Sequence, residues 1–219
     1  MMNWHLHVLP AVQRRLWESR IQAGFAGCVL YGGTALALRL GHRESIDFDF
    51  FSSQPIAPLD FKQENALHGE VLQAGPNTLT LIHEGVKISF FGGLTLHVVS
   101  PPDLLGACPV ASLEDLAACK LAALVNRVEI KDYLDIAALL ESGLPLARML
   151  GCANAVYRGE FPVTACLKSL TWFDAPELAD LSKSHRQLLE KAAIAVEEIP
   201  QITHQASHIG SLNPARPVS

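Results

Sequence analysis

The chain has 219 residues, of which 49% are hydrophobic and 18% are charged, and its formal net charge is -5 at pH 7. A composition this apolar predicts a sizeable buried core and one large domain, or a core with a helical extension. The acidic balance argues against a broad basic surface for nucleic acid, although a local basic pocket stays possible.

Cysteine usage and hydropathy indicate the cellular compartment of the protein. The cysteine count is odd and no pair has C-x-x-C spacing, so we expect buried free thiols rather than disulfides or a cysteine zinc site at Cys28, Cys108, Cys119, Cys152 and Cys166. The first residues, MMNWHLHVLPAVQRR, lack the apolar core of a signal peptide, and no run of about 18 uncharged apolar residues occurs. We therefore expect a cytoplasmic protein with no membrane partner.

Two regions with different periodicity follow one another along the chain. The first predicts a small mixed sheet with short helices: helix 10–23, strand 28–31, helix 34–40, strand 45–51, a helix within 55–70, and strands 78–83, 86–91 and 94–99. The second predicts helices at about 112–127 and 130–140, followed by further helices to 198. We expect an α+β fold with a core in residues 1–110, a helical region in 111–199 that completes an active-site cleft, and a disordered tail in 200–219.

The strand predicted at 45–51 carries two carboxylates. Successive residues of a strand point to opposite faces, so Asp47 and Asp49 share one face, about 7 Å apart at Cα, while Ile46, Phe48 and Phe50 point to the core. Hard divalent cations prefer carboxylate oxygens, and Mg²⁺ typically takes one or two of them together with substrate phosphates. The pattern is compatible with a binding site for Mg²⁺ or Mn²⁺, but D-x-D taken alone is more often a pair of ordinary surface aspartates, so the upstream context decides between the two.

A glycine pair stands upstream, between the strand 28–31 and the helix 34–40. Backbone amides of Gly32 and Gly33 can approach a phosphate closely because glycine lacks Cβ, and Thr34 adds a hydroxyl. Arg43, on the loop before the second strand, is a candidate phosphate or base contact, and Ser45 is expected to hydrogen-bond within that loop. The order of strand, glycine pair, helix and D-x-D strand is more specific than any of its parts.

This segment, GGTALALRLGHRESIDFDFF, resembles the signature of the DNA polymerase beta type of nucleotidyltransferase fold and, more closely, the AbiEii/AbiGii toxin family. A second block agrees with the resemblance: a helix with Lys120 and Arg127, and then KDYLD, which contains Asp132 and Asp135. Together the two blocks cover about residues 25–142.

The resemblance implies roles for the second block. Lys120 would support the pyrophosphate leaving group, Arg127 would do the same or clamp an aspartate, and Asp132 or Asp135 would orient the nucleophile, the metal or Lys120. From the residues alone, the two cations are equally compatible with a solvated stripe, and Lys131 with Asp135 forms a natural i,i+4 ion pair.

The sequence departs from the polymerase-beta pattern at the strand 86–91. A third carboxylate is usual there, but the inward position is Ser89, a poor base and a weak Mg²⁺ ligand, and Lys87 is expected to point to the opposite face. Either Asp132 supplies the base, or the domain binds nucleotide without full catalysis.

The resemblance implies a Mg²⁺-dependent nucleotidyltransferase that transfers NMP from an NTP to a hydroxyl of an RNA such as tRNA, of a protein or of a small molecule. It also implies the toxin of a bacterial toxin–antitoxin or phage-defence pair, with a cognate antitoxin as partner. Two rival hypotheses are a degenerate domain that binds a nucleotide or a partner only, and a D-x-D glycosyltransferase that uses a sugar nucleotide.

Overall fold

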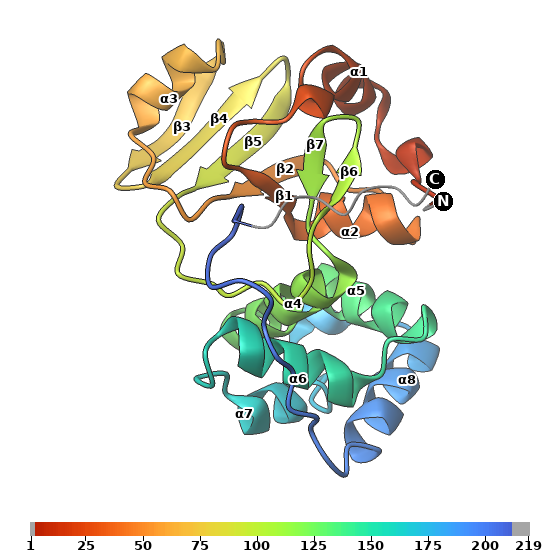
Figure 1. Cartoon of the computed structure of the whole chain (residues 1–219). Helices are drawn as coiled ribbons and strands as arrows, with labels where there is room; N and C mark the ends of the chain where they lie inside the picture. The colour runs from red at the N-terminus through yellow and green to blue at the C-terminus, as the bar shows by residue number, and fades with distance from the viewer. Residues whose placement is uncertain (1–2, 212–219) are drawn as a thin grey trace. The chain divides into compact units, whose positions relative to one another are not determined.

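The computed structural model describes residues 3–211, which form two compact units. The first unit contains residues up to Ser112 together with the segment that starts at Gln205, and the second unit is Leu113–His204. Figure 1 shows that the first unit holds the sheet and the second is helical. This is the α+β class predicted from the sequence.

A seven-stranded mixed sheet is the centre of the first unit, as far as the chain is described, with strand order β3-β4-β5-β2-β1-β7-β6. Its strands are β1 (Val29–Tyr31), β2 (Asp47–Phe51), β3 (Glu70–Gly75), β4 (Thr78–His83), β5 (Val86–Phe91), β6 (Asp103–Leu105) and β7 (Cys108–Val110). Its helices are η1 (Leu6–Val8), α1 (Ala11–Ser19), η2 (Ile21–Ala23), α2 (Gly32–Leu40) and α3 (Pro58–Glu64).

One face of the central strands is an aromatic core. Phe48 and Phe50 of β2 are fully buried, and the ring of Trp17 from α1 lies 6.0 Å from that of Phe48. The Phe25 ring meets the rings of Phe50 and Phe90 edge-on, with 4.9 Å between centroids in each case. Edge-to-face packing of this kind adds to the free energy gained by burial, so the core fixes which face of β2 points inward.

A buried arginine joins α2 to the β6–β7 hairpin. The guanidinium of Arg39 donates to the carbonyl oxygens of Ala111 (2.6 Å) and Val110 (2.9 Å) and pairs with Asp103 at 2.9 Å, and it lies over the Trp4 ring. A buried charge is tolerated only when it is paired and hydrogen-bonded in this way. Arg39 therefore ties the edge of the sheet to the helix that follows the glycine turn.

Several predicted elements of the first unit differ from the observed ones. The second strand begins at Asp47, and Ile46, expected in the core, is 66% exposed because it precedes the strand pairing. The region 94–99 forms only an isolated bridge at Val98, and the sheet gains β3, β6 and β7. Strand β3 is exposed along most of its length, and β6 and β7 have only three residues each, so none of the three shows a clear alternation of apolar and polar residues.

The second unit contains the helices predicted at its start and several shorter ones. They are α4 (Leu113–Asn126), α5 (Ile130–Glu141), α6 (Leu146–Val156), α7 (Val163–Ser169), η3 (Pro176–Leu178) and α8 (Lys183–Ile194). Within residues 3–211 no single helix is long and apolar enough to cross a membrane, and α5 with α6 passes such a test only as a pair bent by 117°.

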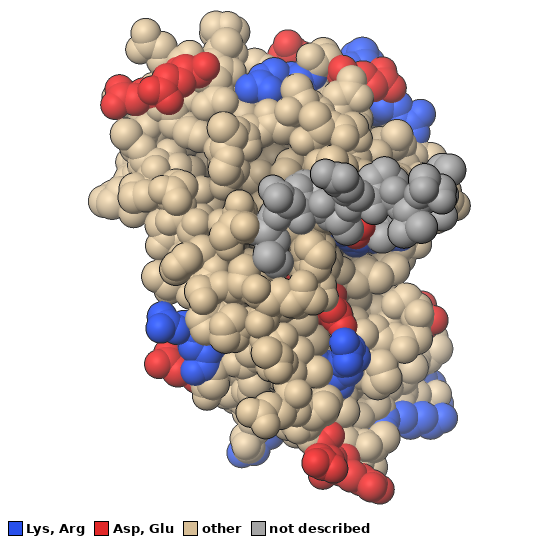
Figure 2. All heavy atoms as spheres, viewed as in Figure 1, with Lys and Arg blue, Asp and Glu red and all other residues tan. Residues whose placement is uncertain are grey.

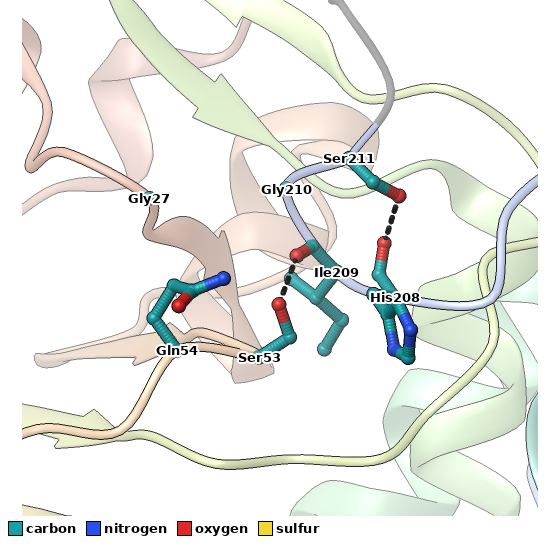
Figure 3. A pocket seen from close by; sticks show the side chains of 7 residues that line it. All are labelled: Gly27, Ser53, Gln54, His208, Ile209, Gly210 and Ser211. Atoms are coloured by element: carbon teal, nitrogen blue, oxygen red, sulfur yellow. Dashed lines mark hydrogen bonds between the residues drawn. The ribbon is translucent and has the colours of Figure 1, made fainter.

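Part of the chain expected to be a disordered tail is ordered. The backbone of Gln205 and Ala206 hydrogen-bonds to Val98, Ile209 is 2% exposed, and its carbonyl oxygen accepts a bond of 2.9 Å from the Ser53 hydroxyl. This contact, drawn in Figure 3, lies beside a pocket of about 330 Å³. One buried isoleucine and an isolated bridge hold residues 205–211 against the rest of the first unit. Neither gives the sequence a periodic pattern of apolar residues from which this order could be predicted. Residues 212–219 lie outside the described part.

Replacing Ile209 with alanine should release this segment. Burial of an isoleucine side chain contributes about 2 kcal/mol, so opening of the Val98–Ala206 bridge should become more frequent by about tenfold or more. Hydrogen exchange at the Val98 and Ala206 amides measures this opening. Ile194→Ala is the matched control, because Ile194 is 80% exposed. Unchanged exchange in Ile209→Ala would show that the segment is not held by this side chain.

Candidate active site

The glycine turn after β1 fits closely around a carboxylate. Helix α2 begins directly at Gly32, whose φ is +73°, a conformation that favours glycine. A Cβ at Gly32 would collide with the Asp49 carboxylate. The turn therefore requires glycine twice, for its backbone angle and for the approach of Asp49.

The next residues connect the start of α2 to the D-x-D strand. The Thr34 hydroxyl, which is buried, hydrogen-bonds to Ser45 Oγ (2.8 Å) and to the backbone carbonyl oxygen of Asp47. A Cβ at Gly33 would lie 2.6 Å from Arg43 Nη2 and 3.3 Å from Ser45 Oγ. The structure thus brings together all the sequence-predicted residues of this segment, and the Thr34 hydroxyl serves the loop that aims Asp47.

The two aspartates share one face of β2, as the alternation predicts. Asp47 and Asp49 are half-buried, whereas Phe48 between them is fully buried. Strand β2 pairs with β5 in parallel, and Asp47 lies opposite Lys87 in the register. The Lys87 Nζ is 3.1 Å from Asp47 Oδ2.

The expected orientation of Lys87 is therefore wrong. Residues i and i+2 of a strand share a face, so Lys87 and Ser89 both lie on the side of the two aspartates. The sequence spacing carries this information, because Ser89 is the inward position of the strand and Lys87 stands two residues before it. Lys87 is the residue of this site whose position was missed.

Ser89 occupies the position opposite Asp49, where the resemblance to the polymerase-beta pattern led us to expect a third carboxylate. It is 3% exposed, and its hydroxyl accepts a hydrogen bond of 3.3 Å from Thr80 of β4. Among residues 3–211 no group of three or more His, Cys, Asp or Glu side chains is arranged to hold a metal ion. A divalent cation could be held here by two carboxylates, Asp47 and Asp49, with its other ligands from phosphate and water.

A second set of predicted residues forms a buried ion network in the helical unit. The Lys120 ammonium of α4 lies 3.0 Å from Asp132 Oδ1 and 2.6 Å from Asp135 Oδ2. Both aspartate side chains are fully buried, and that of Lys120 is 7% exposed. Burial of three charges demands such pairing, because an unpaired charge would carry a large desolvation cost.

Arg127 completes this network from the end of α4. Its Nε is 2.8 Å from Asp132 Oδ2, and its Nη2 is 3.3 Å from Asp132 Oδ1. Arg127 thus clamps Asp132, one of the two roles considered for it. The i,i+4 pair of Lys131 with Asp135 is not formed, because Asp135 pairs with Lys120 and Lys131 pairs with Glu129 at 2.8 Å.

These features define the class of protein. A mixed sheet whose second strand carries D-x-D beside a glycine turn, followed by a helical unit with paired Lys and Asp, corresponds to the nucleotidyltransferase fold. Residues 15–79 and 69–199 match the family of the nucleotidyl transferase AbiEii toxin of type IV toxin–antitoxin systems, and the chain belongs to this family. An uncharacterized protein of Aquifex aeolicus (strain VF5) is 30% identical over 174 residues, which cover 76% of this chain and 84% of the relative.

Substituting Gly32 with alanine should destabilise the first unit by about 2–4 kcal/mol, because a left-handed conformation and a steric clash with Asp49 act together. Gly85→Ala is the matched control in the same unit. Its φ is +79°, but the nearest atom to an added Cβ is 3.8 Å away, so only the backbone cost of about 1–2 kcal/mol applies. Urea denaturation measures both values, and equal losses would contradict the close approach of Asp49.

Removing Asp132 should destabilise the helical unit by about 3–5 kcal/mol, since Lys120 and Arg127 lose a buried partner. Glu114→Ala breaks the more exposed pair with Arg148 in the same unit and should cost less than about 1 kcal/mol. Chemical denaturation compares the two variants. A similar small loss in both would mean that the buried network contributes no more than a surface pair.

Proposed function

We propose that the protein is a Mg²⁺-dependent nucleotidyltransferase that transfers NMP from an NTP to an acceptor hydroxyl, and that it acts as a toxin. The observation that carries the proposal is the shared face of Asp47 and Asp49 beside the glycine turn at Gly32. Membership in the AbiEii family supports the reaction class.

The residues of the first unit would divide the work as follows. Asp47 and Asp49 hold the cation, which neutralises phosphate charge when bound. The amides at the start of α2, at Gly32 and Gly33, face the phosphates, because the amino end of a helix carries unpaired N–H groups and a partial positive charge. Arg43, whose Nη2 lies beside Gly33, adds a full positive charge at the same place.

The reaction itself needs little covalent chemistry from the protein. The acceptor oxygen attacks the α-phosphorus, the bond from that phosphorus to the bridging oxygen breaks, and pyrophosphate leaves with the bonding electrons while the hydroxyl proton passes to solvent water. Positioning and charge stabilisation dominate such transfers. The ordering of Asp47 by Thr34 and Ser45 serves this purpose.

The role of the second unit is proposed from the resemblance and from its own contacts. Asp132 is fully buried and both of its oxygens accept hydrogen bonds from cations, an arrangement that suits orientation of Lys120 and Arg127 better than abstraction of a proton. We assign Asp132 and Asp135 as positioning residues for Lys120, which would support the leaving group.

The surface charge bears on the choice of acceptor, and the family bears on the antitoxin. On the face seen in Figure 2, described Lys and Arg side chains lie in small groups beside Asp and Glu, separated by uncharged surface. An RNA acceptor bound at that face would gain little from bulk charge, so recognition would have to be local. The family's description as a type IV toxin–antitoxin system supports a cognate antitoxin as partner.

A second candidate function is nucleotide or partner binding without transfer. The observation in its favour is Ser89, which stands opposite Asp49 and is hydrogen-bonded to Thr80 instead of offering a carboxylate.

Incubation of the purified protein with each α-labelled NTP, Mg²⁺ and total RNA tests the proposal. Transfer of label to an acceptor is expected, and Asp47→Asn with Asp49→Asn should lower it by at least about 1,000-fold, since loss of charge stabilisation at the reacting phosphate costs several kcal/mol. Omitting RNA, or adding candidate proteins, shows the acceptor class.

The double variant nearly preserves side-chain volume, and Asp60→Asn with Glu64→Asn on α3 is a charge-matched control that should leave transfer unchanged. Tight NTP binding without transfer in the wild type would favour the binding-only function. Turnover with a sugar nucleotide alone would contradict both.

A further inference from the structure

Lys87 forms an ion pair with Asp47, one of the two carboxylates that would bind the cation in the proposed function. Its Nζ lies 3.1 Å from Asp47 Oδ2, which is within hydrogen-bonding distance and makes the two groups an ion pair. The contact follows from the parallel register of β2 and β5, which sets the two residues directly opposite each other. It is therefore built into the sheet and does not depend on a flexible loop.

The ion pair is well placed to be exchanged. The side chains of Lys87 and Asp47 are 42% and 32% exposed, so both are in contact with water. Pairs this exposed contribute little, typically less than about 1 kcal/mol. The lysine stem is flexible and carries a single charge, whereas a divalent cation would bring twice that charge to the same oxygen.

We propose that Lys87 is a resident counter-ion of the candidate metal site, which a divalent cation must displace from Asp47. This inference rests on the proposed function of that face. Lys87 lowers the affinity for a free cation, while a cation already bound to a triphosphate brings ligands of its own and loads the site more readily. Lys87 thereby couples metal loading to nucleotide arrival.

Binding of Mn²⁺ alone, followed by the electron paramagnetic resonance signal of the free ion, tests this role without any turnover. Lys87→Met keeps the length of the side chain and removes the charge, and it should bind Mn²⁺ about two- to fivefold more tightly than the wild type. Lys62→Met, on α3 of the same unit, removes an equal charge and should leave the affinity unchanged. Melting temperatures of both variants check that they fold.

Equal or weaker Mn²⁺ binding by Lys87→Met would overturn the inference, and so would an equal gain in Lys62→Met, which would indicate a general effect of net charge. The double variant Asp47→Asn with Asp49→Asn distinguishes a failure of the proposed metal site from a failure of the role of Lys87. If Mn²⁺ binding of the wild type survives in that double variant, the proposed metal seat itself fails. If binding is lost there but Lys87→Met behaves as the wild type, only the role of Lys87 fails.

Discussion

The alternation of side chains along β2 is the constraint on which the rest of the first unit depends. Phe48 and Phe50 fill the aromatic core, so Asp47 and Asp49 must point to the other face. A slip of one residue would exchange the two sets and place carboxylates among phenylalanine rings, at a large desolvation cost. The hydrophobic core therefore fixes the geometry of the acidic face without any contact to a ligand.

The same register determines the neighbours of the two carboxylates. Pairing with β5 sets Lys87 beside Asp47 and Ser89 beside Asp49, and the turn at Gly32 closes over Asp49 from β1. The constraint in the helical unit is different. Lys120, Asp132 and Asp135 are buried charges, and each is tolerated in the interior only because it pairs with the others. In both units the residues that suggest chemistry are positioned by packing and pairing of ordinary kinds.

Much of this arrangement could be predicted from the sequence. The elements that could not be predicted are those that have no local sequence pattern. The glycine turn, the D-x-D strand and the helices α4 and α5 have strong local patterns, and the resemblance linked them to a family that the comparison bears out. Strands β6 and β7 have three residues each, too few for alternation to appear. The order of residues 205–211 depends on long-range contacts such as Ile209 with Ser53.

Within the candidate site, spacing along a strand was more informative than spacing along a helix, because the i,i+4 pair of Lys131 with Asp135 is not formed. The shared face of Asp47 and Asp49 follows from their i,i+2 spacing, and the same rule places Lys87 with Ser89. Spacing along the sequence could not show whether Lys131 or Lys120 is the partner of Asp135. The packing of α4 against α5 brings Lys120 to Asp135, and this contact joins residues of different helices. Burial decided between the two lysines, since Lys120 is enclosed and Lys131 is half-exposed.

The proposed function requires Asp47 and Asp49 to bind one divalent cation together. Crystals soaked in Mn²⁺ and a non-hydrolysable NTP would locate the ion by its anomalous scattering. We expect a peak about 2.0–2.3 Å from an oxygen of each of the two carboxylates, with phosphate oxygens completing the coordination. A nucleotide bound with its ion elsewhere, and with both aspartates uncoordinated, would contradict it.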